Sequence, residues 1–120
     1  MKKGSPDRYV DIGTHRVHIN DFGKGSPVVV FVACAGGDID EWVKQVHEID
    51  KYTRVISYDR SGLGKTENIG THRSLKGMTD ELYLFLERGK IPSPYILVAH
   101  SLGGTIIRYL STICPLLIVE

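Results

Sequence analysis

Cysteine is scarce in this sequence, and a long apolar segment is absent. The two cysteines, Cys34 and Cys114, form neither a Cys-x-x-Cys pair nor the spacing of metal ligands, so we expect no disulfide scaffold and no metal. A reducing compartment is then expected. The longest apolar run, residues 28–35, is too short to cross a bilayer, and residues 1–8 are not followed by the apolar core of a signal peptide. The sequence therefore predicts a cytoplasmic protein without membrane attachment.

An excess of charge of one sign is also lacking. Fifteen Lys and Arg face fourteen Asp and Glu, which gives a formal net charge of +1, and the basic residues form no continuous run. A nucleic acid or an anionic membrane is therefore not an expected partner. Repeats and low-complexity tracts are absent as well, and the 42% hydrophobic fraction is typical of a globular chain. We expect a single domain over residues 1–120.

The order of the elements indicates the fold class. Alternating apolar and polar residues predict a hairpin of two strands at residues 8–12 and 15–22. Apolar runs predict further strands, buried on both faces, at residues 28–33, 55–58, 95–99 and 116–119. Helical spacing predicts helices at residues 40–49, 75–86 and 102–113. This alternation predicts an α/β fold with an open, mostly parallel sheet, helices on both faces and an N-terminal antiparallel hairpin.

Three glycine-bearing loops follow the predicted parallel strands, at residues 34–38, 59–66 and 100–104. In open α/β sheets, ligands bind outside the carboxyl ends of the strands. We therefore expect the functional site among these three loops.

The last of these loops places a serine between an apolar strand and a helix. Its sequence is Ala-His-Ser-Leu-Gly, with Ser101 at the centre. A serine in a strained turn with positive φ requires small residues two positions away on each side, and Ala99 and Gly103 meet this requirement. We expect Gly104 to let the helix pack closely on the strand. The pattern predicts a nucleophile at Ser101, with helix amides that favour a developing oxyanion; the alternative is a plain turn with a capping serine.

Three segments, in the same order along the chain, resemble the α/β-hydrolase family. Tyr-Ile-Leu-Val-Ala-His-Ser-Leu-Gly-Gly at residues 95–104 is similar to the family's nucleophile strand, with Ala99 in place of the usual first glycine. Residues 28–42 are similar to its third strand and oxyanion loop, and residues 58–67 to the turn after its fourth strand. The resemblance covers nearly the whole chain from Arg8. It implies a serine hydrolase that transfers the acyl group of a small ester or amide to water without a cofactor.

The resemblance also implies roles for the neighbours of Ser101. The backbone N–H groups of Ala35 and Leu102 would form the oxyanion hole. The sequence departs from the family where Cys34 replaces a usual glycine, but backbone donors tolerate such a change, and we interpret Cys34 as a small buried hydrophobe. His100 cannot be the base of Ser101, because consecutive side chains at this turn point in different directions. We expect His100 to be a packed or hydrogen-bonded structural residue.

The partners that such a nucleophile needs do not follow it in the sequence. In this fold the chain order is serine, then an acid, then histidine. No histidine follows Ser101. The only carboxylate after it is Glu120, the final residue, which is a weak candidate for the acid. We therefore expect the 120 residues to be an incomplete or inactive member. The apolar strand from Leu116 to Val119 would then form an uncovered edge through which chains self-associate.

Two other functions stay open. The loop from Asp59 to Thr66 differs by one residue from the phosphate-binding pattern G-x-x-x-x-G-K-[ST] and follows an apolar strand, which would suit nucleotide binding. Asp59 would put a carboxylate beside the phosphates, however, and residues 67–70 are a poor start for a helix. In the hydrolase interpretation Asp59 and Arg60 fix this turn, and its glycines permit it. The remaining possibility is a non-catalytic remnant that binds a ligand or a partner.

Overall fold

A computed structural model describes residues 7–33, 36–67 and 74–113 of the chain. Its elements, in chain order, are β1 (Asp7–Asp11), β2 (Arg16–Phe22), β3 (Val28–Val32), the 3₁₀-helix η1 (Ile39–Trp42), α1 (Val43–Ile49), β4 (Val55–Tyr58), α2 (Leu75–Arg88), β5 (Tyr95–Ala99) and α3 (Leu102–Ile113).

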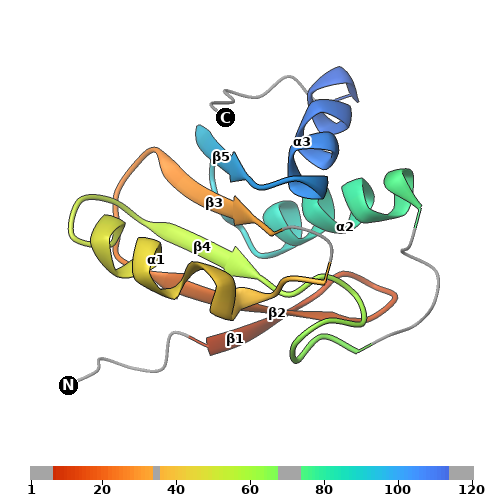
Figure 1. The fold of residues 1–120 in the computed structure, drawn as a ribbon, viewed down its shortest axis with the longest axis horizontal. Coiled ribbons are helices and arrows are strands. Elements are labelled where there is room, and N and C mark those ends of the chain that lie inside the picture. The colour runs from red at the N-terminus through yellow and green to blue at the C-terminus, as the bar shows by residue number, and fades with distance from the viewer. Residues whose placement is uncertain (1–6, 34–35, 68–73, 114–120) are drawn as a thin grey trace.

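The strands form one mixed sheet in the order β1-β2-β4-β3-β5 (Figure 1). β1 pairs with β2 and β2 with β4 in antiparallel fashion, whereas β3 runs parallel to both β4 and β5. Every residue of β3 and β4 is buried, as their sequences predict. The predicted α/β sheet with an N-terminal antiparallel hairpin is confirmed.

Helices cover both faces of this sheet and create two cores. α1 lies on one face, and α2 and α3 lie on the other (Figure 1). Successive side chains of a strand point to opposite faces, so β3 serves both cores. Val30 packs in the larger core beneath α2 and α3, and Phe31 packs in the smaller core beneath α1. There the Phe31 ring stacks on the ring of Trp42, with 4.5 Å between the ring centroids.

The predicted bounds of the described strands hold to within one residue, and the helices differ from the prediction in two places. The first helix begins as the 3₁₀ turn η1, which the Asp38 side chain caps by accepting a hydrogen bond from the Asp40 N–H at 3.0 Å. The second helix, α2, continues to Arg88 and ends before Gly89. The predicted strand at residues 116–119 lies outside the described residues. Among the helices that the structure describes, none combines the length and apolar character needed to cross a bilayer.

Candidate active site

Ser101 occupies the turn between the carboxyl end of β5 and the start of α3, and its φ is +57°. A side chain in this left-handed region costs about 1–2 kcal/mol, so the surrounding structure has to hold it there. The His100 N–H donates to the Val32 carbonyl at 3.3 Å, and the Gly104 N–H donates to the Ser101 carbonyl at 2.8 Å. The serine is exposed. The predicted strained turn at Ser101 is therefore present.

Gly103 is the point at which α3 approaches β3. A Cβ at residue 103 would lie 2.2 Å from the Val32 oxygen and 3.1 Å from the Ala33 oxygen, so only glycine fits. At Gly104 a Cβ would meet nothing within 4 Å. The prediction that Gly104 permits the close packing is therefore wrong. One residue further along a helix points about 100° away, and that rotation turns residue 104 from the sheet.

Of the two predicted oxyanion donors, the structure describes one. Leu102 is the first residue of α3, where backbone N–H groups have no partner within the helix. Such a helix end favours negative charge. Ala35 lies outside the described residues, as do Cys34 and the candidate acid Glu120.

His100 is hydrogen-bonded, as predicted for a structural residue, but it is not packed in the core. Its Nδ1 lies 3.0 Å from Oε2 of Glu41 in η1. The His100 side chain is 64% exposed and that of Glu41 is 23% exposed. The pair therefore joins η1 to the turn of Ser101 at the surface.

Asp59 fixes the loop after β4 from within. Its buried carboxylate accepts hydrogen bonds from the N–H groups of Ile39, at 2.9 Å, and Lys65, at 3.0 Å. It also lies 2.8 Å from Nδ1 of His18. A Cβ at Gly64, whose φ is +52°, would lie 2.3 Å from the same carboxylate. The role that the hydrolase interpretation gives to Asp59 and to this glycine agrees with these contacts.

The geometry of a phosphate-binding loop is not formed over residues 59–67. The Asp59 carboxylate already accepts the Lys65 amide that would have to point at a phosphate. Residues 61–66 form turns, and the next described helix along the chain, α2, begins only at Leu75, so no described helix starts directly after the loop as a phosphate-binding loop requires.

The sequence model of the alpha/beta hydrolase fold matches residues 27–113, which include the turn of Ser101, the loop of Asp59 and the sheet between them. The chain belongs to the α/β-hydrolase family.

Relatives of known name or structure are much longer than this α/β-hydrolase chain. A protein of Hormonema carpetanum named "Probable transporter efuK" is 34% identical over 107 residues, which are 82% of this chain and 15% of that protein. The "Putative carbamate hydrolase RutD" of Klebsiella pneumoniae is 36% identical over 85 residues, 68% of this chain and 31% of its own length. A mutant epoxide hydrolase of Vigna radiata superposes with a TM-score of 0.82 at 26% identity, over 93% of this chain and 36% of that one. The chain thus spans about a third or less of each of these proteins.

A second set of polar contacts, referred to below as the network, supports the loop after β4 in this α/β-hydrolase. The sequence predicts the part that Arg60 plays in it, but not the parts of Glu81 and His15. Arg60 is buried, and its Nη1 donates to the carbonyl oxygen of Ala33 at 2.7 Å. Glu81 of α2 accepts the Ser61 N–H at 3.1 Å and lies 2.7 Å from Nε2 of His15. The side chains of Glu81 and His15 are both fully buried. The network ties α2 and the hairpin to the loops beside the candidate site.

One signal in the sequence could have revealed Glu81. It lies three residues after Met78 and four before Phe85, on the apolar stripe of its helix. A carboxylate at such a position predicts a buried partner, because burying an unpaired charge is costly.

Near this network, burial is the main cause that raises the pKa of Tyr58 above its ordinary value, so this phenol stays neutral.

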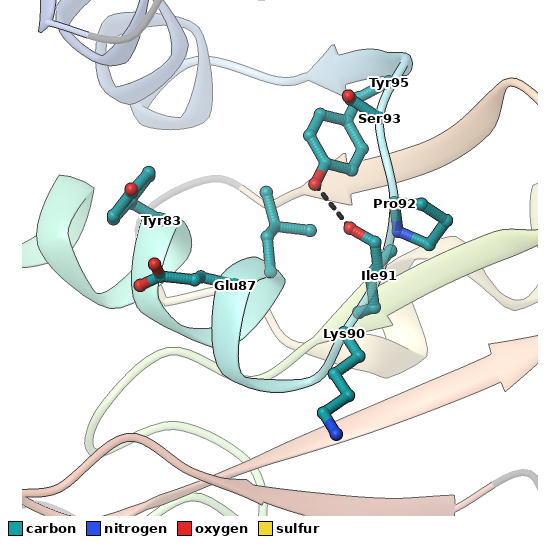
Figure 2. A pocket seen from close by; sticks show the side chains of 8 residues that line it. Tyr83, Glu87, Lys90, Ile91, Pro92, Ser93 and Tyr95 are labelled. Atoms are coloured by element: carbon teal, nitrogen blue, oxygen red, sulfur yellow. Dashed lines mark hydrogen bonds between the residues drawn. The ribbon is translucent and has the colours of Figure 1, made fainter.

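A cavity of about 420 Å³ lies beside the start of β5, and Figure 2 shows the side chains that line it. Its wall is formed by the end of α2, including Tyr83 and Glu87, and by the segment from Lys90 to Tyr95. The Tyr95 hydroxyl donates to the Ile91 carbonyl and closes one side. Tyr95 begins β5, whereas Ser101 follows the end of the same strand, so a molecule bound in this cavity would lie at the other end of β5 from the serine hydroxyl.

Proposed function

We propose that this chain carries the nucleophile, Ser101, and both oxyanion donors, the backbone N–H groups of Leu102 and Ala35, of a serine hydrolase that acts on a small ester or amide. The observation that carries the proposal is the left-handed φ of +57° at Ser101, a serine exposed between β5 and α3. Strain of this kind persists only where the structure over-determines it, and it is concentrated at functional sites. The hydrolase names among the relatives support the reaction class and leave the substrate open.

In the proposed reaction, Oγ of Ser101 attacks the substrate carbonyl carbon and loses its proton to a base. The negative charge that develops on the carbonyl oxygen is met by the N–H of Leu102, at the positive end of α3, and by the N–H of Ala35. The tetrahedral intermediate then collapses, and the alcohol or amine leaves with the proton that the base had taken, so that an acyl-serine remains. Water attacks this acyl-serine and gives a proton to the base, and the carboxylic acid is released as the base returns the proton to Oγ of Ser101.

These 120 residues contain no histidine after Ser101, where the family order places the base. We therefore propose that the polypeptide of 120 residues, produced alone, reacts at Ser101 but hydrolyses esters very slowly. An oxyanion hole and substrate binding alone retain about 10³–10⁴-fold acceleration over water in enzymes that lack a triad member. Robust turnover of p-nitrophenyl acetate that Ser101→Ala abolishes would show that a base is present after all.

Covalent labelling with a fluorophosphonate tests the nucleophile. We expect one adduct by intact mass after hours of incubation, located at Ser101 by peptide mapping. Ser101→Ala removes it, and Ser61→Ala, in the neighbouring loop, leaves it unchanged. Equal labelling of wild type and Ser101→Ala would contradict the proposal, and so would no labelling of the folded wild type, which would favour a non-catalytic binding protein.

A further inference from the structure

The pair of His100 and Glu41 is adjacent to the strained serine but takes no part in the proposed reaction. It joins two segments that are far apart in the sequence, because Glu41 belongs to η1 and His100 is the residue before Ser101. The distance between Nδ1 and Oε2 is 3.0 Å, which is a hydrogen bond when Nδ1 carries a proton. A hydrogen bond to a carboxylate is stronger than one between two neutral groups.

Glu41 itself lies beside the loop that follows β3. A Cβ at Gly37 would lie 2.0 Å from Oε1 of Glu41, so the carboxylate lies directly on the backbone of this glycine. The Glu41 N–H also donates to the Asp38 carbonyl at 3.1 Å. The carboxylate therefore lies against this loop, and a side chain that binds it is linked to the loop.

We propose that Glu41 and His100 are positioning residues that hold the turn of Ser101 in its left-handed conformation. The inference rests on the proposed function of Ser101. The backbone bonds of the turn include a long one, from the His100 N–H to the Val32 carbonyl at 3.3 Å, so a side-chain tether at the same residue adds a restraint where the backbone has slack. Releasing the tether lets residue 100 rotate and lowers the population in which the serine is presented.

The experiment is a double-mutant cycle on the full 120-residue chain with Glu41→Ala, His100→Ala and the double variant. One readout is the rate of fluorophosphonate labelling at Ser101, and a second is hydrogen exchange at the amides of His100 and Gly103. We expect each single variant to slow labelling and to speed exchange by about two- to fivefold, the range that an exposed ion pair supplies. The double variant is expected to match the single ones, because the first change already breaks the pair.

A matched control separates positioning from general stability. Asp50→Ala breaks the exposed pair of His47 and Asp50, which are 3.4 Å apart on and just after α1, and we expect neither readout to change. The melting temperature is expected to fall by no more than the loss of one exposed pair causes, and by a similar amount in Asp50→Ala as in the other single variants. A purely structural role would lower the melting temperature and leave the labelling rate of the folded protein unchanged, and that result would overturn the proposal.

The two readouts also separate this inference from the proposed function. If wild type is not labelled but exchange at His100 and Gly103 rises in Glu41→Ala, the nucleophile proposal fails and the restraint on the turn stands. If exchange does not change, the positioning role is wrong whatever the labelling shows. Where wild type is labelled at Ser101, faster exchange with an unchanged labelling rate would also overturn it, and so would additive effects of the two changes in the double variant.

Discussion

At the scale of single residues, the site depends on a backbone conformation that only glycine adopts freely. The φ of Ser101 is +57°, and the neighbouring turn bonds hold it there. Glycine at this position would remove the steric penalty of the Cβ atom, whereas alanine would keep the penalty and remove only the hydroxyl. The two substitutions therefore separate conformational strain from chemistry.

We expect Ser101→Gly to be more stable to unfolding than Ser101→Ala by about 0.5–1 kcal/mol. The relief of strain exceeds the added entropy of the unfolded glycine chain, which offsets part of it. Urea denaturation of both variants measures the difference, and neither variant is expected to react with the fluorophosphonate. A glycine variant less stable than the alanine variant would show that residue 101 is not strained.

At the scale of elements, the contact between α3 and β3 depends on the absence of one side chain. Gly103→Ala is expected to destabilise the fold by about 1–3 kcal/mol, because the new methyl group would overlap the Val32 carbonyl, 2.2 Å away, and push the helix from the sheet. Gly104→Ala meets open space and is expected to stabilise α3 by about 0.5 kcal/mol through higher helix propensity. Thermal and urea unfolding check both. Equal effects of the two changes would contradict the assigned contact.

Elements and contacts differ in how far the sequence predicts them. The bounds of β4, β5 and α3 follow from apolar runs and helical spacing, which are local properties. The assignment of the close contact to Gly104 was wrong, because whether a helix position requires glycine depends on which residues of the neighbouring strand it faces, and the local sequence does not show this. The bond between His15 and Glu81 spans 66 residues of sequence, and no local pattern pairs them.

A cluster of ion pairs between strands, called the clamp here and formed by Asp21, Arg54 and Arg8, makes the stability of the fold depend on pH. The Asp21 carboxylate in β2 accepts hydrogen bonds from Nε and Nη2 of Arg54, at 2.9 and 2.7 Å. It also accepts one from Nη2 of Arg8 in β1, at 3.1 Å. Burial raises the pKa of Asp21, but the hydrogen bonds and charges of Arg54 and Arg8 outweigh it, and the net pKa is lowered below 3.8. A lowered pKa means that the clamp stabilises the fold above about pH 4 and that this stability is lost as pH falls through the lowered value.

We expect Asp21→Asn to cost about 1 kcal/mol at pH 7, a figure kept small by solvent screening of these partly exposed groups. The difference between wild type and variant should shrink as pH falls from about 4 to 2, where wild-type Asp21 becomes protonated. Urea unfolding at several pH values measures it. Asp80→Asn, in the exposed pair with Lys76, serves as the control for loss of a surface charge.

At the scale of the whole molecule, one edge of the sheet determines how the 120-residue polypeptide behaves in solution. Within the described part of the chain, β5 pairs with β3 alone, so the backbone groups on its other edge have no strand partner there. The side chains of Ile96 and Val98 are partly exposed beside this edge. An unpaired apolar edge is a template for pairing with another chain.

We expect this polypeptide to self-associate with rising concentration, as measured by size-exclusion chromatography with light scattering. The sequence predicts a further apolar strand at residues 116–119, so Leu117→Lys, which places a charge in that run, should reduce association, because a single lysine disfavours pairing along an edge. Tyr52→Lys replaces an apolar side chain that is 83% exposed elsewhere on the surface and should leave association unchanged. A monodisperse wild-type monomer with a cooperative melt would show that the edge is protected, and equal effects of both lysines would assign the association to general surface hydrophobicity.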